Sequence, residues 1–225
     1  MANETEKEAA GRASVAFVHD GDAVGLGTGS TAAYAVRFLA ERVKAGMKIR
    51  GIPTSSGTRD LALSLGIPLT TFDDVQQIDV TIDGADEFDP QLNLIKGGGG
   101  ALLREKIVAS ASNKVVIVTD ASKRVRVLGK FPLPVEVIPF AQALVARRIV
   151  ALGAAVKLRQ GADGNPYVTD ERHHILDCSF GEIPDPAALA RVLDGIPGIV
   201  EHGLFIDLAS VVLVAKDGGV EEIRR

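Results

Sequence analysis

The sequence predicts an α/β protein in which a doubly wound, mostly parallel sheet is joined to a second, smaller α+β domain. Through the first half of the chain, short apolar runs alternate with helical patterns, which is typical of a parallel sheet covered by helices. After Phe131-Pro132-Leu133-Pro134 the order of patterns changes to βαββαβ, the split βαβ arrangement of a ferredoxin-like domain. We therefore expect a larger, Rossmann-like domain over residues 1–130 and 205–225, and a smaller domain over residues 131–204.

The elements of the larger domain follow from its apolar runs and turn residues. An amphipathic helix is expected over residues 4–18, with an apolar side made of Ala9, Ala13, Ala16 and Phe17. Strands are expected at 23–27, 48–52, 67–70, 78–82 and 115–119, and a last strand at 211–215 returns to the same sheet. A long helix with the stripe Ala32, Val36, Leu39 and Val43 ends near Gly46, a second ends at Leu65, and a third starts at Ala101.

The smaller domain has four expected strands and two expected helices. The strands are 133–138, 154–160, 173–179 and 198–204, and the helices are 140–152 and 185–195. The polar segment 161–170 joins the two middle strands as a hairpin loop.

Composition and charge exclude several classes of protein. The 225 residues are 46% hydrophobic and 24% charged, with a net charge of −4 and no basic run longer than two residues, so nucleic acid is not expected as a partner. No apolar run approaches the roughly 20 residues that a membrane span needs, and the polar amino end does not resemble a secretory signal. The single cysteine, Cys178, excludes an internal disulfide and is expected to be buried in a strand. We expect a soluble, cytoplasmic protein.

Residues 78–109 carry a dense set of polar groups between apolar segments. Asp83 and Asp86 follow a strand, Lys96 comes next, and four consecutive glycines precede a helix that carries Glu105. Four glycines cost backbone entropy on folding, so they suggest that a ligand approaches the backbone closely. Ligands of open α/β sheets bind at the carboxyl ends of strands, where these carboxylates lie, although acidic residues also form ordinary turns.

Glu105 stands out when its helix is viewed in projection. It falls in the apolar arc made by Ala101, Leu102, Val108 and Ala109. No basic residue lies three or four places from it, and a carboxylate in such a stripe tends to have a raised pKa and suits a general base. An ordinary surface glutamate is the alternative.

The turn Thr28-Gly29-Ser30-Thr31 follows a strand and opens a helix, so backbone N–H groups and hydroxyls converge there. We favour a phosphomonoester site; a plain strand–helix turn and a dinucleotide site remain as alternatives. The sequence Gly27-x-Gly29-x-x-Ala32 matches a relaxed dinucleotide fingerprint, but the second strand ends at residues 52–55 without the acid that would bind a ribose hydroxyl. The loop does not end as a Walker A motif does.

Lys123 and the pair His173-His174 are further candidate functional groups. Lys123 follows another strand end, so topology brings it toward the same crevice, although a lysine there is otherwise simply solvated. His173 and His174 are adjacent in a strand and point to opposite faces, so they cannot share a metal. No metal ligands and no cofactor are predicted.

Several motifs, in order along nearly the whole chain, together resemble ribose-5-phosphate isomerase of the A type. They are Gly27–Thr31, Asp83-Gly84-Ala85-Asp86-Glu87, Lys96–Leu102, Arg104-Glu105-Lys106, Gly129–Val137 and Gly203-Leu204-Phe205. Leu103 stands where many members have threonine, next to the expected base and not in its place.

The resemblance implies a cofactor-free interconversion of D-ribose 5-phosphate and D-ribulose 5-phosphate in the non-oxidative pentose phosphate pathway. It also implies a homodimer, or a dimer of dimers. Carried over by motif, Glu105 is the proton acceptor, Lys96 stabilises charge on oxygen, and Asp83 or Asp86 moves a hydroxyl proton. The implied substrate-binding residues are Thr28, Gly29, Ser30, Thr31, Asp83, Gly84, Ala85, Asp86, Lys96, Gly97, Gly98, Gly99 and Lys123.

Two functions of other classes compete with this one. A sugar-phosphate-sensing module would bind the same ligand without turning it over, but such a module needs no base such as Glu105. A transferase or dehydrogenase would hold a nucleotide-containing cofactor in the glycine-rich turn, and the missing acid after the second strand argues against NAD.

Overall fold

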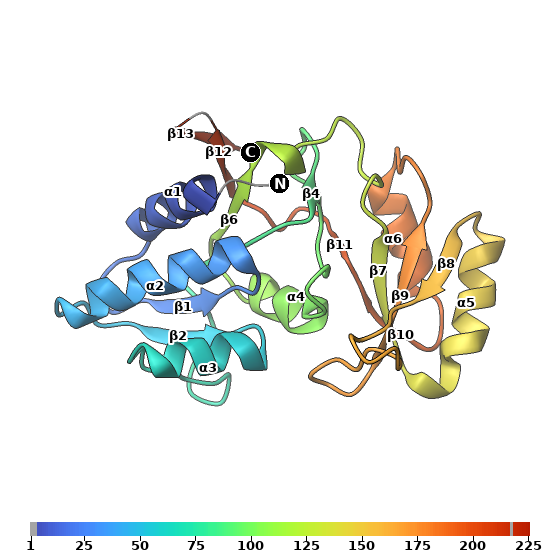
Figure 1. Ribbon diagram of the computed structural model, residues 1–225, viewed down its shortest axis with the longest axis horizontal. Coiled ribbons are helices and arrows are strands. Elements are labelled where there is room, and N and C mark those ends of the chain that lie inside the picture. The colour runs from blue at the N-terminus through green and yellow to red at the C-terminus, as the bar shows by residue number, and fades with distance from the viewer. Residues whose placement is uncertain (1–3, 217) are drawn as a thin grey trace. The chain divides into compact units, whose positions relative to one another are not determined.

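The computed structural model describes residues 4–216 and 218–225, which form two compact units (Figure 1). Unit 1 contains the described residues up to Ala85 together with Arg104–Arg124 and Asp207–Arg225, and unit 2 contains Asp86–Leu103 and Val125–Ile206. No helix among these residues combines the length and apolar character needed to cross a membrane.

The units divide the chain at other places than the domain boundaries expected from sequence. Residues 86–103, 125–130 and 205–206, expected in the larger domain, group with unit 2. One reason is a small antiparallel sheet of β4 (Glu87–Phe88), β5 (Leu94–Ile95) and β11 (Leu204–Phe205), whose Ile95 and Leu204 join the apolar core of unit 2. Another is the buried Glu87 carboxylate, which accepts hydrogen bonds from the N–H groups of Gly129 (2.8 Å) and Phe131 (2.5 Å).

Unit 1 is built on a six-stranded sheet in the order β13-β12-β6-β3-β1-β2. Its strands are β1 (Ala23–Leu26), β2 (Arg50–Pro53), β3 (Val80–Asp83), β6 (Val115–Asp120), β12 (Val211–Lys216) and β13 (Gly219–Arg224). All neighbours pair in parallel except β12 and β13, which are antiparallel. The predicted fold class and the return of the last apolar strand to this sheet are both confirmed.

Helices cover both faces of this sheet. They are α1 (Glu4–Ser14), α2 (Ser30–Lys44), α3 (Ser56–Ser64) and α4 (Leu102–Ser110), with short 3₁₀ turns η1 (Val15–Phe17) and η2 (Ala121–Lys123). Val24 and Leu26 of β1 point into the core that α1 and α2, side by side in Figure 1, help to form. Ala23 points the other way and packs with Val108 of α4. Alternate side chains of one strand thus serve two helical layers, as a doubly wound sheet requires.

Details of unit 1 depart from the sequence prediction. The first α-helix ends at Ser14 and continues only as a 3₁₀ turn, which leaves Ala16 exposed while Ala10 and Ser14 are buried. The expected strand at 67–70 is reduced to a single bridge between Gly51 and Leu69, because Pro68 has no N–H to donate to a ladder. Strand β13 was missed because its side chains are largely polar and exposed.

Unit 2 contains a four-stranded antiparallel sheet in the order β10-β7-β9-β8. Its elements are β7 (Leu133–Val137), η3 (Pro139–Ala141), α5 (Gln142–Ala151), β8 (Ala155–Leu158), β9 (His174–Ser179), α6 (Pro186–Asp194) and β10 (Ile199–His202). This is the predicted βαββαβ order, with the first and third strands in the centre, and it confirms the ferredoxin-like arrangement.

The core of unit 2 lies between this sheet and its two helices. Val135 and Leu176 from the sheet pack with Val145 of α5 and Leu193 of α6. Cys178 of β9 is buried in the same core, as predicted, and burial raises the pKa of its thiol to about 12. The thiol is therefore a structural group and not a reactive one.

Candidate active site

The predicted phosphate turn connects β1 to α2 in unit 1. Gly29 has φ 119°, a conformation that favours glycine, and it is the residue before the first turn of α2. The N-cap residue Gly29 has no side chain to accept from the first N–H groups of α2, and both Gly29 and Ser30 are exposed. An exposed helix start of this kind is suited to bind an anion.

Asp83, at the end of β3, lies directly against this turn. Its Oδ1 accepts hydrogen bonds from the N–H groups of Thr28 (3.0 Å) and Gly84 (2.8 Å), and the residue is only 2% exposed. A Cβ atom at Gly27 would lie 2.3 Å from Asp83 Oδ1, so only glycine allows this approach. Because β1 and β3 are neighbours in the sheet, their carboxyl ends bring the turn and the carboxylate together.

Hydroxyl groups of the segment that follows β2 hold Thr28 in place. Its Oγ1 donates to Ser55 Oγ (2.9 Å) and lies 2.7 Å from Thr54 Oγ1. Ser55 Oγ donates to Thr58 Oγ1 (3.1 Å), which in turn donates to the carbonyl of Gly27 (3.0 Å). With its N–H given to Asp83 and its hydroxyl proton given to Ser55, Thr28 positions the turn and leaves ligand contacts to the residues after it.

This hydroxyl network is not among the features predicted from the sequence, where residues 52–55 enter only because they lack the acid of a dinucleotide site. The available signal was the concentration of hydroxyl residues in Thr54-Ser55-Ser56-Gly57-Thr58, immediately after the strand that neighbours β1. In open α/β sheets, polar residues at adjacent strand ends meet at one edge.

Glu105 occupies the buried side of α4. It is 4% exposed and lies in line with the buried residues Leu102, Val108 and Ala109, whereas Ile107 on the other side is 46% exposed. The apolar stripe predicted around this carboxylate is therefore confirmed. Burial shields its oxygens from bulk water, as a group that transfers protons to and from carbon requires.

Lys123 is the last residue of η2, immediately after β6. The preceding strand ends at Asp120, whose Oδ1 accepts a hydrogen bond from Ser122 N (2.8 Å) and so fixes the turn. Since β6 pairs with β3, Lys123 belongs to the same carboxyl-end edge of the sheet as Asp83. Its side chain is half-buried.

In unit 2, Lys96 follows β5 directly and is 3% exposed. Its N–H donates to the carbonyl of Gly203 (2.9 Å), and a Cβ at Gly203 would lie 2.2 Å from Lys96 O. Its Nζ lies 5.5 Å from the centre of the Phe205 ring, within range of a cation–π interaction. Gly203, just before β11, and Phe205 within it thus position the buried Lys96.

Asp86 and the glycine run of residues 97–100 are in direct contact. Asp86 Oδ2 accepts a hydrogen bond from the N–H of Gly98 (2.7 Å), and a Cβ at Gly98 would lie 2.5 Å from Asp86 Oδ1. Gly97 and Gly100 have φ values of 103° and 80°, which favour glycine. Packing within unit 2 therefore favours glycine at Gly97, Gly98 and Gly100, and the close approach of a ligand to this run stays a prediction.

The predicted site residues are thus distributed over both units. Thr28–Thr31, Asp83–Ala85, Glu105 and Lys123 belong to unit 1, and Asp86 and Lys96–Gly99 belong to unit 2. The structure brings Thr28 to Asp83 and Asp86 to Gly98.

The histidine pair has separate partners. His173 Nδ1 lies 3.0 Å from Glu136 Oε1, and His174 Nδ1 lies 2.6 Å from Gln142 Oε1. Burial raises the pKa of the Glu136 carboxyl group, while hydrogen bonds from Thr169 and His173 act in the opposite direction. The two imidazoles do not meet at one ligand, as predicted.

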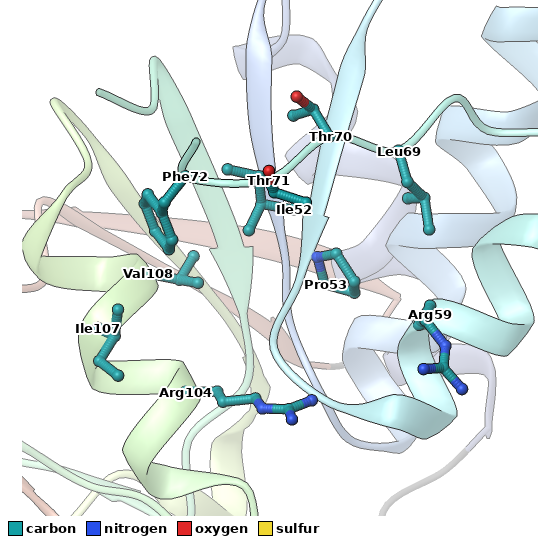
Figure 2. Close-up of a pocket in the computed structure, with 10 residues that line it drawn as sticks. All are labelled: Ile52, Pro53, Arg59, Leu69, Thr70, Thr71, Phe72, Arg104, Ile107 and Val108. Carbon is teal, nitrogen blue, oxygen red and sulfur yellow. The ribbon is translucent and has the colours of Figure 1, made fainter. Parts of the chain in front are cut away.

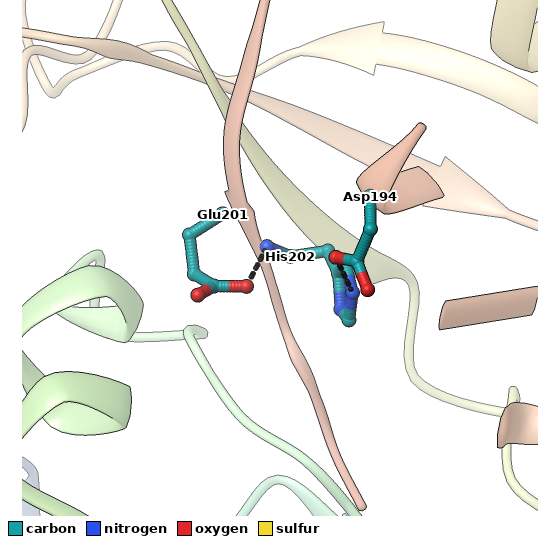
Figure 3. Close-up of side chains that lie close together, drawn as sticks. All are labelled: Asp194, Glu201 and His202. Atoms are coloured by element: carbon teal, nitrogen blue, oxygen red, sulfur yellow. Dashed lines mark hydrogen bonds and ion pairs between the residues drawn. The ribbon is translucent and has the colours of Figure 1, made fainter. Parts of the chain in front are cut away.

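A different histidine belongs to the one group of potential metal ligands found among the described residues, Asp194, Glu201 and His202 (Figure 3). His202 Nδ1 accepts a hydrogen bond from the N–H of Leu204 (3.2 Å), so the ring proton lies on Nε2, which is 3.0 Å from Asp194 Oδ1. Both ring nitrogens are therefore used by the protein. The group stabilises the end of β10 and is poorly suited to bind a metal ion.

A hollow of about 380 Å³ lies elsewhere in unit 1, between α3, α4, the end of β2 and the segment 69–72 that follows α3 (Figure 2). Apolar side chains such as Ile52, Phe72 and Ile107 line it, with Arg59 and Arg104 at its rim. None of the predicted site residues lines this hollow. It is distinct from the candidate site.

Comparison with known proteins gives the same family across the chain. The family model "Ribose 5-phosphate isomerase A (phosphoriboisomerase A)" matches residues 50–219. A ribose-5-phosphate isomerase A from Parvibaculum lavamentivorans is 52% identical, and the similarity covers 99% of both chains. One from Chloroflexus aurantiacus is 54% identical over 98% of this chain and 93% of that relative.

Solved structures agree with the sequence comparisons. A D-ribose-5-phosphate isomerase in complex with phospho-erythronic acid is 40% identical, has a TM-score of 0.97 and covers 100% of both chains. The ribose 5-phosphate isomerase A of Methanocaldococcus jannaschii is 41% identical, with a TM-score of 0.95 and the same coverage. The chain belongs to the ribose 5-phosphate isomerase A family.

Proposed function

We propose that the protein interconverts D-ribose 5-phosphate and D-ribulose 5-phosphate, as in the non-oxidative pentose phosphate pathway, with Glu105 as the general base. The observation that carries the mechanism is the burial of Glu105 in the apolar stripe of α4, within the Arg104-Glu105-Lys106 motif of the family. A carboxylate that is sheltered from water is suited to move a proton between neighbouring carbons.

The reaction needs only proton transfers. Glu105 takes the proton from C2 of the open-chain aldose, and the C2–H electron pair forms the C1–C2 double bond of a cis-enediolate. Glu105 then returns the proton to C1, while the hydroxyl proton moves from O2 to O1, so that the aldehyde becomes a hydroxymethyl group and C2 becomes a ketone. No electron acceptor is needed, which is why no cofactor is expected.

Charge develops on the substrate oxygens during this sequence. The buried ammonium group of Lys96 is suited to stabilise that charge, because electrostatic interactions are strong where water is excluded. This part of the proposal requires Lys96 of unit 2 and Glu105 of unit 1 to act on one substrate.

The two aspartates are suited to different tasks. Asp83 is buried and its Oδ1 already accepts two backbone hydrogen bonds, so it fits the role of holding the phosphate turn. Asp86 is half-buried, and its Oδ2 accepts a hydrogen bond from the N–H of Gly98. We assign the transfer of the hydroxyl proton to Asp86.

The phosphate group is the remote anchor of the substrate. The exposed start of α2 offers backbone N–H groups and the hydroxyls of Ser30 and Thr31, with Lys123 on the same sheet edge as a cationic partner. Binding energy gained there orients C1 and C2 at the catalytic groups.

Turnover of ribose 5-phosphate in the presence of EDTA, with no cofactor added, tests this function. The parent protein should form ribulose 5-phosphate, Glu105→Gln should lose about 10²–10⁴-fold in kcat with little change in substrate affinity, and Glu41→Gln, at an exposed position of α2, should behave like the parent. Near-normal turnover by Glu105→Gln would refute the assignment of Glu105 as the general base.

Binding measurements separate the proposed function from its rivals. Phospho-erythronic acid, the ligand of a related isomerase, pairs a phosphate with a carboxylate that mimics the enediolate, so it should bind here too. Binding of ribose 5-phosphate without turnover would instead indicate a sensor, and binding of a nucleotide would indicate a cofactor-dependent enzyme. The homodimer stays a prediction, to be checked by light scattering, and so does the cytoplasmic location.

A further inference from the structure

We propose that Arg159, braced by Asp177, is a positioning residue that fixes the glycine run of unit 2 for catalysis. The inference rests on the proposed function, because it concerns the Lys96–Gly99 segment. Neither Arg159 nor Asp177 lies in any of the motifs that carry the family resemblance.

Arg159 is held rigidly by the sheet of unit 2. It follows β8, and its N–H donates to the carbonyl of Ile175 in β9 (2.9 Å). Its Nε donates to Asp177 Oδ2 (3.0 Å) and its Nη2 to Asp177 Oδ1 (2.5 Å). The side chains are only 13% and 25% exposed, so this bidentate pair is sheltered from water and its planar guanidinium has one orientation.

The third guanidinium nitrogen of Arg159, Nη1, contacts the glycine run of residues 97–100. Arg159 Nη1 donates to the carbonyls of Gly97 (2.8 Å) and Gly98 (3.2 Å). The Gly97 carbonyl belongs to the same peptide group as the Gly98 N–H, which donates to Asp86 (2.7 Å). A cation therefore holds the oxygen of this peptide group and an anion holds its N–H, an arrangement in which each hydrogen bond strengthens the other.

A second contact holds the far end of the run. The N–H of Tyr167 donates to the carbonyl of Arg159 (2.9 Å), and the Arg159 guanidinium lies 6.0 Å from the Tyr167 ring centre. A Cβ at Gly100 would lie 2.3 Å from the Tyr167 hydroxyl oxygen, so this ring packs directly on Gly100. The segment that contains Arg159 thus contacts Gly97, Gly98 and Gly100.

The consequence concerns two groups with proposed catalytic roles. Lys96 precedes the fixed peptide group in the chain, and the Asp86 carboxylate accepts its N–H. If this peptide group rotates, the backbone of Lys96 shifts and the Asp86 carboxylate loses the N–H group that fixes its position. Since misplacement by about 1 Å can cost roughly 100-fold in rate, freeing the peptide should lower kcat by about 10- to 100-fold. KM should change much less, because the phosphate turn is in unit 1.

Three variants test the proposal. Arg159→Lys keeps the positive charge but cannot bridge Asp177 and both carbonyls, and Asp177→Asn leaves the arginine without its brace. Arg126→Lys is the matched control, because its partner is the exposed Glu182 (3.2 Å; side chains 80% and 69% exposed). The readouts are kcat, KM, the melting temperature, and hydrogen–deuterium exchange of the amides in residues 97–103.

The proposal expects Arg159→Lys and Asp177→Asn to lower kcat while KM stays within about threefold, and to speed amide exchange at 97–103 selectively. The proposal is overturned if both variants match the control in kcat and in amide exchange. It is also overturned if amide exchange rises equally throughout unit 2 and the loss of kcat follows the loss of melting temperature, because Arg159 would then have a merely structural role. If Arg159→Lys fails to fold, Asp177→Asn decides. An inactive parent protein would refute the proposed function, while the exchange measurement would still test whether Arg159 and Asp177 fix residues 97–100.

Discussion

Two glycine-rich segments of this protein look similar in sequence and differ in what they do. In unit 1, residues 25–29 lead into α2 and end at Gly29, an exposed N-cap residue that has no side chain to cap the helix. In unit 2, residues 97–100 donate to Asp86, accept from Arg159 and pack against Tyr167. The first segment ends at a helix start whose N-cap glycine has no side chain, and the peptide groups of the second hold the protein's own side chains.

The reason for glycine also differs between them. A Cβ at Gly27 would meet the backbone of Asp83, with its Cα 2.5 Å away, so the adjacent strand ends could not approach. A Cβ at Gly98 would meet only the carboxylate of Asp86, which can swing aside. Glycine at the first position protects the fold, and glycine at the second protects the placement of one functional group.

Gly27→Ala should have the largest effect on stability. Because the clash is with backbone, β1 and β3 must separate locally, and the free energy of unfolding should fall by about 3 kcal/mol. Denaturant unfolding measures this, with Gly57→Ala as the control, since its nearest neighbour is 3.9 Å away. Equal stability of the two variants would contradict the contrast between the segments.

Gly98→Ala should affect turnover and spare the fold. The new methyl group displaces the Asp86 carboxylate, so kcat should fall by about tenfold or more, while the free energy of unfolding falls by less than about 1 kcal/mol. Steady-state kinetics and denaturant unfolding on the same sample separate the two effects. A variant that is unstable and has normal kcat per folded molecule would reverse the argument.

Thr58→Val should weaken the phosphate turn without touching the glycine run. It removes the hydroxyl that donates to Gly27 and accepts from Ser55, leaving a buried carbonyl short of a partner at a cost of about 1–2 kcal/mol. KM for ribose 5-phosphate should rise several-fold and kcat should hold. Thr71→Val, at an exposed position, is the control, and an unchanged KM for Thr58→Val would exclude the network from substrate binding.

The reactivity of the Cys178 thiol reports whether β9 of unit 2 stays folded next to Asp177. Its pKa in the folded protein is about 12, against a usual 9.0, so the folded state keeps a proton that the unfolded chain loses. Stability from this group is complete below pH 9 and is lost as the pH rises toward 12. A thiol reagent at pH 9 should therefore label the unfolded protein and not the folded one; rapid labelling of the folded protein would show that β9 opens.

The sequence was informative where pattern and chemistry are local. The order of strands and helices, the buried stripe around Glu105 and the separation of His173 from His174 all depend on periodicities of 3.6 or 2 residues, and the structure confirms them. Two-residue strands such as β4 and β5 were missed because they are too short to show alternation.

The contacts of Thr28 and Arg159 could not be derived from the sequence. Ser55 lies 27 residues from Thr28, and Gly97 lies 62 residues from Arg159, so only the register of the sheets brings them together. The side chains that pack on the glycine run come from distant parts of the chain for the same reason, so their contacts with it could not be predicted either.

The most direct test of the account follows the proton at C2. Ribose 5-phosphate converted by the parent protein in D₂O should give ribulose 5-phosphate with deuterium at C1, because a carboxylate base exchanges its proton with solvent while the enediolate exists. Glu105→Gln should give no labelled product above the rate of buffer alone. Turnover at a normal rate by Glu105→Gln, with or without label in the product, would contradict the assignment of Glu105 as the base.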